Sequence, residues 1–225
     1  MIKQIVQRVA ENSSCLFERL ESDFEDYSFY VARDPNYQRF LVVLETDQLS
    51  APSELNEQVQ ACTPPILLGT PSFAKNTDLV ILFKLGSLTE LKQYEHNIFD
   101  IEENAYSLKK HLLYYTSTEL EQLNEYLELG GTLYELLANS DAFNRYKQNP
   151  TEETAFSLAC RLYIKLPFLA VPAQEAILTS ANELAEQLLS EAQLLPFLNS
   201  IEQKLGDGHT CQEIMEVLIN EQMED

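Results

Sequence analysis

The spacing of apolar and polar positions in the first half of the chain predicts a helix followed by strands. In residues 1–14, an apolar face recurs at helical spacing between polar residues, which indicates an amphipathic helix; its members are Ile2, Ile5, Val6 and Val9. Three runs of strand length follow: SCLFERL (14–20), YSFYVAR (27–33) and RFLVVLET (39–46). Asp-Pro-Asn at 34–36 is a strong turn signal, so the second and third runs are predicted to form a hairpin.

The next elements define the fold class. A short helix is expected after Pro52, and DLVILFKL (78–85) is a fourth strand, which gives the order α-β-β-β-α-β. After Gly86 the strand signal disappears, and the segment up to residue 115 has helical spacing. We predict an α+β fold: a small mixed or antiparallel sheet domain with flanking helices over residues 1–100, followed by an all-α helical region over residues 101–225.

Capping signals predict where the later helices begin. Asn149-Pro150 and Pro172 are each expected to start a helix, and the second carries an apolar stripe, Ile177 to Leu188, that requires a partner helix. Three Thr-x-x-Glu pairs have the spacing of a capping box, in which a hydroxyl and a carboxylate bind free backbone amides: Thr116 with Glu119, Thr132 with Glu135, and Thr210 with Glu213.

Charge restricts the class of partner. The formal net charge is −21, of which −7 falls in residues 1–115 and −14 in residues 116–225. Beyond Leu166 the one basic residue is Lys204, against eleven acidic residues. Such a surface repels phosphate backbones, so broad nucleic-acid binding is not expected. A basic protein surface is the more plausible partner.

Composition and cysteine spacing suggest a cytoplasmic protein. No apolar run reaches the roughly 18 residues that a transmembrane helix needs, and the N-terminal helix lacks the apolar core of a signal peptide. The four cysteines are far apart and contain no CxxC pair, which fits neither a zinc site nor a dense disulfide framework. We expect reduced thiols, no metal, no cofactor and no membrane.

One enzymatic hypothesis requires a specific test, because restriction-endonuclease-like nucleases share the α-β-β-β-α-β order. Their site needs an acid on the second core strand and acid-x-Lys on the third, where two carboxylates hold Mg²⁺. Here the third strand ends Glu45-Thr46-Asp47, without the lysine. Glycine-rich phosphate loops, G-x-S-x-G elbows and paired metal-binding histidines are also missing from the sequence. We therefore expect no catalytic residues, although a sheet that has lost such a site stays compatible with the pattern.

The segment IEENAYSLKKHLLYYT (101–116) combines basic and aromatic residues in an otherwise acidic chain. We expect a helix here, on which Lys109, Lys110 and His111 point about 100° apart and do not form one cluster. An amphipathic helix with a lysine face, a protein-docking surface and direct nucleic-acid contact remain alternatives. The candidate protein interface consists of six residues: Tyr106, Lys109, Lys110, His111, Tyr114 and Tyr115.

This segment also carries a family resemblance. Residues 75–123, with a KNTDL strand start, an acidic helix ending IEEN and then KKHLLYYT, resemble the middle component of bacterial ABC-three-component systems. That family includes the LmuC-type subunits of Lamassu anti-phage defence. The resemblance implies a non-catalytic accessory subunit that scaffolds or restrains an effector, often a nuclease, beside an SMC-like or Rad50-like coiled-coil ATPase. Two other functions stay open: a divergent metal-dependent nuclease, and an acidic inhibitor that mimics nucleic acid.

Overall fold

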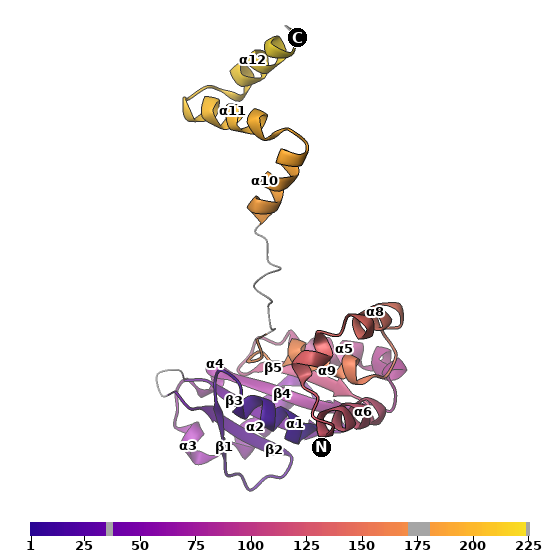
Figure 1. Ribbon diagram of the computed structural model, residues 1–225. Helices are drawn as coiled ribbons and strands as arrows, with labels where there is room; N and C mark the ends of the chain where they lie inside the picture. The colour runs from indigo at the N-terminus through magenta and orange to yellow at the C-terminus, as the bar shows by residue number, and fades with distance from the viewer. Residues whose placement is uncertain (35–37, 171–180, 224–225) are drawn as a thin grey trace. The chain divides into compact units, whose positions relative to one another are not determined.

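A computed structural model describes residues 1–34, 38–170 and 181–223, and the side chains of these residues other than 181–183 and 218–223. The chain divides into two compact units, Met1–Val171 and Pro172–Asp225. The first unit contains the following elements (Figure 1): α1 (Ile2–Glu11), β1 (Phe17–Leu20), β2 (Tyr27–Ala32), β3 (Phe40–Thr46), α2 (Pro52–Cys62), α3 (Pro65–Leu68), α4 (Phe73–Asn76), β4 (Thr77–Lys84), a 3-10 turn (Leu88–Glu90), α5 (Leu91–Glu102), β5 (Lys109–Tyr115), α6 (Ser117–Glu128), α7 (Leu133–Leu137), α8 (Ser140–Gln148) and α9 (Ala155–Lys165).

The five strands form one mixed sheet in the order β1-β2-β3-β4-β5. Strand β2 is antiparallel to β1 and β3, whereas β4 is parallel to both β3 and β5. The predicted hairpin is confirmed, with Tyr27 opposite Leu44. Of its predicted turn, Pro35 and Asn36 lie outside the described residues. The predicted α+β class, a mixed sheet with flanking helices and a helical C-terminal region, is confirmed.

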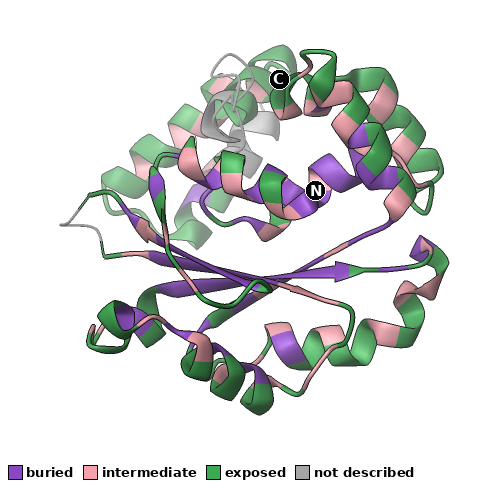
Figure 2. Cartoon of the chain, turned by 90° about the horizontal axis from the view of Figure 1, so that it is seen from below, coloured by how far each residue is buried: buried purple, intermediate pink, exposed green. Residues whose placement is uncertain are grey.

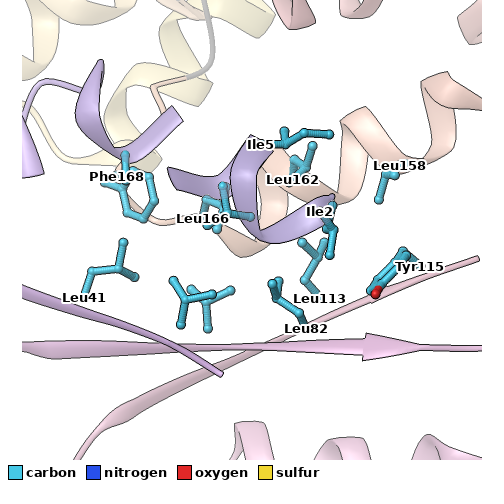
Figure 3. Close-up of a cluster of buried hydrophobic side chains, with 14 of the residues drawn as sticks. Ile2, Ile5, Leu41, Leu82, Leu113, Tyr115, Leu158, Leu162, Leu166 and Phe168 are labelled. Carbon is cyan, nitrogen blue, oxygen red and sulfur yellow. The ribbon is translucent and has the colours of Figure 1, made fainter. Parts of the chain in front are cut away.

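Helices cover both faces of the sheet, so the unit has three layers (Figure 2). On one face, α1 and α9 pack on β3, β4 and β5; Figure 3 shows Ile2 and Leu162 pointing toward Leu82 and Leu113. On the other face, α2 and α5 enclose a second cluster around the buried side chains of β3 and β4. This double cover explains why FLVVL and DLVILFKL are apolar without alternation.

The prediction of helix across residues 87–115 is wrong for its last part. Helix α5 ends at Glu102, and Lys109–Tyr115 form the strand β5, which pairs with β4. Successive side chains of β5 enter opposite core clusters: Leu112 joins the one under α5, and Leu113 and Tyr115 join the one under α9. Tertiary pairing therefore overrides the local helical spacing. The sheet extends past residue 100, and its unit extends to Val171.

The capping predictions are largely confirmed. Reciprocal hydrogen bonds are present at all three boxes, including Thr210 N to Glu213 Oε2 at 2.8 Å. The helix predicted at Asn149-Pro150 instead begins at Ala155, because the Thr154 hydroxyl accepts from Ser157 N at 3.2 Å and supplies the cap.

The second unit confirms the predicted helical C-terminal region. It contains α10 (Ala181–Glu191), α11 (Leu195–Gly206) and α12 (Cys211–Met223). The start predicted at Pro172 and the first part of its apolar stripe lie outside the described residues. Within the described part of the chain, no helix is long and apolar enough to cross a membrane.

Candidate protein-interaction site

The six predicted interface residues do not form one surface, because β5 distributes them between both faces of the sheet. Tyr106 is 82% exposed in the loop before β5, and Lys109 is exposed at the first position of the strand. Lys110 and Tyr115 are buried, and His111 and Tyr114 are half-buried. Each of the buried or half-buried residues has a partner within the chain, described next. Whether any of the six contacts a partner protein stays a prediction.

Lys110 fastens the loop that precedes β5. Its Nζ donates to Asn104 Oδ1 at 3.1 Å and to the carbonyl oxygens of Tyr106 at 2.8 Å and Leu108 at 3.1 Å. Burial lowers the pKa of this ammonium below its usual value. Because all three donor directions are used inside the chain, Lys110 shapes the loop that presents Tyr106.

His111 belongs to a buried ion-pair cluster at the start of β4. Its Nε2 lies 3.2 Å from Asp78 Oδ1, while Arg39 Nε donates to Asp78 Oδ2 at 2.9 Å. The Asp78 side chain is 3% exposed. Burial alone would raise its pKa, but the hydrogen bond from His111 and the charge of Arg39 hold the pKa of Asp78 below its usual value. The acidic residue inside an otherwise apolar strand was the sequence signal for this cluster.

Tyr114 lies beneath a second buried ion pair, which joins β5, α6 and α9. The Arg161 guanidinium stacks 4.5 Å from the centre of the Tyr114 ring, and its Nη2 contacts Glu119 Oε1. Glu119 is fully buried and is also the acid of the Thr116 capping box. Burial raises the pKa of Glu119, and Arg161 opposes that shift without cancelling it.

A third ion pair covers the outer edge of the sheet at β5. Glu102 Oε1, at the end of α5, accepts from Leu112 N at 2.8 Å, and Lys165 Nζ at the end of α9 donates to both Glu102 oxygens at 2.6 and 2.7 Å. Glu102 therefore occupies a backbone donor that an added strand would need, and Lys165 holds the Glu102 carboxylate in place. This arrangement disfavours partner binding by strand addition at β5.

The surface next to Tyr106 is a groove of about 360 Å³. Helix α2 forms one wall, the 68–74 segment another, and Ser107 and Leu108 close the end. Asn56, which lines the groove, donates from Nδ2 to the Tyr106 carbonyl at 3.4 Å. Exposed Ile66 and Leu68 on α3 add apolar surface that the sequence analysis did not single out. We call this surface the Tyr106 groove.

The residues of the nuclease hypothesis lie at the other end of β3. Glu45 is half-buried and its Oε1 lies 3.4 Å from the Tyr115 hydroxyl, whereas Asp47 is exposed beyond the strand. Burial, together with Glu45, raises the pKa of Tyr115 to about 12. Lys3 on α1 was not a candidate site residue in the sequence. In the structure, burial lowers its pKa, although the nearby charges of Glu45 and Asp26 act to raise it.

Two further expectations concern metals and thiols. Across the described residues, no group of three or more His, Cys, Asp or Glu side chains is arranged to hold a metal ion. The four cysteines are all free, with Cys15 buried and Cys211 exposed. Within the described residues, the structural features at β5 are three ion pairs, centred on Asp78, Glu119 and Glu102, and the nearby Tyr106 groove.

Comparison with known families gives one match. Residues 39–140 match the family ABC-three component (ABC-3C) system Middle Component 1. The match runs from β3 to α7 and confirms the resemblance predicted from residues 75–123. The narrower LmuC-type assignment stays a prediction. The family supports an accessory component of a defence system that works with other subunits. No curated protein and no solved structure matches the chain.

Proposed function

We propose that the protein is a non-catalytic accessory subunit of a bacterial anti-phage defence complex. In this role it bridges an SMC-like, coiled-coil ATPase and a nuclease-type effector, and restrains or positions the effector. Phosphate contacts with DNA then belong to the ATPase, because this chain carries a formal net charge of −21.

The family match over residues 39–140 is the observation that carries this proposal. The matched part contains the Asp78 cluster completely, since Arg39, Asp78 and His111 all lie within it. It also contains β5 and every residue that lines the Tyr106 groove, from α2 to residues 107–108. The matched part therefore contains strands β3 to β5 of the sheet and a groove with polar and apolar side chains, which suits a scaffold.

Co-purification tests the proposal. The full chain, tagged and co-expressed with the products of its adjacent genes, is expected to elute with a coiled-coil ATPase in one peak on gel filtration. Elution as a free monomer, with no affinity for either neighbouring product, would contradict the assignment. Replacing the exposed Tyr106 by Asp tests the Tyr106 groove, with Leu129→Asp, at an exposed residue of the first unit that does not line the groove, as the control.

One observation favours a second candidate, a divergent metal-dependent nuclease. Lys3 Nζ donates to the Glu25 carbonyl, and Glu45 N donates to the Asp26 carbonyl at 3.1 Å, so two acids and a lysine lie near one end of the sheet even though acid-x-Lys is missing from β3. Two carboxylates can hold a divalent ion, and a lysine can orient a water molecule for attack.

Plasmid nicking separates the two candidates. A nuclease would nick supercoiled DNA in the presence of Mg²⁺ or Mn²⁺, and both Glu45→Ala and Lys3→Met would abolish the nicking. The accessory function predicts no nicking by the purified chain. It also predicts that Glu45→Ala leaves assembly with the ATPase intact. Glu45 lies toward the end of β3 opposite to the Tyr106 groove, which is the candidate contact surface.

A further inference from the structure

The second unit has helices but almost no core. Among residues 184–217, whose side chains the structure describes, Ile214 is the one buried residue. Six large apolar side chains of the same range are exposed, at 43–60% of their surface: Leu184, Leu188, Leu194, Phe197, Leu205 and Met215. The first unit, by contrast, has two extensive buried clusters.

Local signals define these helices without tertiary packing. The Thr210–Glu213 box fixes the start of α12, and Pro196 lies in the first turn of α11. The three helices have 11, 12 and 13 residues. Helices of this length are marginal alone in water, and most helical stability in proteins comes from burying an apolar face. The sequence thus encodes helices whose apolar faces require a surface to cover them.

The exposed apolar residues lie on coherent faces. Leu184 and Leu188 are one turn apart on α10. At about 100° per residue, Leu194, Phe197 and Leu205 fall within about 80° of one another around α11. We call this set of five leucine and phenylalanine residues the C-terminal stripe. Scattered exposed leucines need no explanation, but faces of this kind mark interaction sites.

Charge indicates what covers the stripe. Residues 172–225 contain eleven acidic residues and one lysine, a formal net charge of −10. The remaining 171 residues contain 25 acidic and 14 basic residues, so the rest of the chain is also acidic. Like charges disfavour a second copy and the first unit as the cover, and nucleic acid and anionic lipid are disfavoured for the same reason. The complementary surface is apolar with a rim of Lys and Arg.

We propose that α10–α12 form a docking arm that packs the C-terminal stripe on an apolar, Lys- and Arg-rimmed surface of a partner subunit. The inference rests on the proposed accessory function and assigns the second unit, which lies outside the family match, to one contact of the complex. The acidic residues beside the stripe, such as Glu191 on α10 and Glu202 on α11, steer the arm and set its register, while the stripe supplies the buried area.

Stripe variants of the full chain provide the test. Leu188→Asp combined with Phe197→Asp is compared with Leu129→Asp combined with Ile164→Asp, two apolar residues of the first unit that are 83% and 70% exposed. In gel filtration and biolayer interferometry with the adjacent-gene product that binds the wild-type chain, the stripe variant is expected to bind at least about 100-fold more weakly. The control pair is expected to change affinity by less than about threefold. Tyrosine fluorescence verifies that the first unit is folded in both.

Hydrogen exchange gives a second readout on the same samples. In the isolated chain, the amides of α10–α12 are expected to exchange much faster than those of β3 and β4, and to become protected in the complex. Protection in the isolated monomer would show that the first unit covers the stripe, and a dimer that the stripe variant dissolves would show that a second copy does; either result overturns the docking arm. Wild-type binding by the stripe variant also overturns it but leaves the accessory function standing. Failure of the wild-type chain to bind any neighbouring product overturns both.

Discussion

Replacing Arg161 by Met tests how α9 is held on the family-matched part of the chain. The Arg161 side chain is 10% exposed and Glu119 is fully buried, so the substitution leaves a carboxylate inside the protein without its counter-charge. The Thr116 amide still donates to Glu119 Oε2 at 3.1 Å, but the stacking on Tyr114 is lost. Removing one partner of such a buried pair costs about 3–5 kcal/mol.

The pH dependence follows from the pKa of Glu119. Burial raises that pKa and Arg161 lowers it, so in the variant it rises further. A carboxyl group whose folded pKa is raised destabilises the protein while ionised, and the penalty disappears as pH falls through the folded pKa. The cost of Arg161→Met is therefore largest near neutral pH and shrinks in acid. Adding Glu119→Gln removes the stranded charge and should restore much of the loss.

Urea unfolding followed by tyrosine fluorescence is a suitable assay, because the eleven tyrosines all precede residue 171 and report on the first unit alone. A loss of about 3 kcal/mol corresponds to a fall in Tm of roughly 6–12 °C. Arg33→Met is the matched control, since its ion pair with Glu18 is about 60% exposed on both sides and contributes at most about 1 kcal/mol. A loss from Arg161→Met below about 1 kcal/mol, or one equal at pH 5 and pH 7.5, would refute the reasoning.

Three further predictions concern β5 and β4. Lys110→Met should lower the free energy of unfolding by about 1–3 kcal/mol because three oxygens of the 104–108 loop lose their donor. Lys109→Met should change it by less than about 0.5 kcal/mol in the same urea assay. Equal effects of the two substitutions would mean that β5 is misplaced. Tyr115→Ala should cost about 3–5 kcal/mol because the ring is buried, and Tyr115→Phe well under that, since its hydroxyl contact is 3.4 Å; a large loss with Phe would contradict this. Because the pKa of Asp78 is lowered in the fold, the stability that its carboxylate contributes is present above about pH 4 and is lost as pH falls through the folded pKa. The free energies of unfolding of the wild type and Asp78→Asn should therefore converge as pH is lowered. Parallel curves would exclude the Asp78 cluster as the cause of the acid-induced loss of stability.

Much of the fold could be predicted because local signals and burial patterns agree. Phe40–Thr46 and Thr77–Lys84 are apolar throughout, and a sheet covered on both faces requires that pattern. The capping boxes mark helix starts through contacts three residues apart, so they survive any tertiary context.

Strand β5 could not be predicted because its stability depends on distant residues. The run Lys109-Lys110-His111 suggests a solvated face. In the structure, however, the buried Lys110 donates to loop carbonyls, and His111 binds Asp78, which lies 33 residues earlier in the chain. The ion pair between Glu102 and Lys165 joins residues that are 63 positions apart in the sequence. Such pairings carry no local spacing signal, so the interface predicted from this segment contained residues that the fold uses internally.

The bridging role is the central claim, and subunit omission tests it most directly. The ATPase, the effector and this chain are co-expressed, and each gene is then omitted in turn. The mass of the complex is measured by light scattering after gel filtration. The account predicts one complex that contains ATPase, effector and this chain, and separation of ATPase from effector when this chain is omitted. An ATPase–effector complex of unchanged stability without this chain would contradict it.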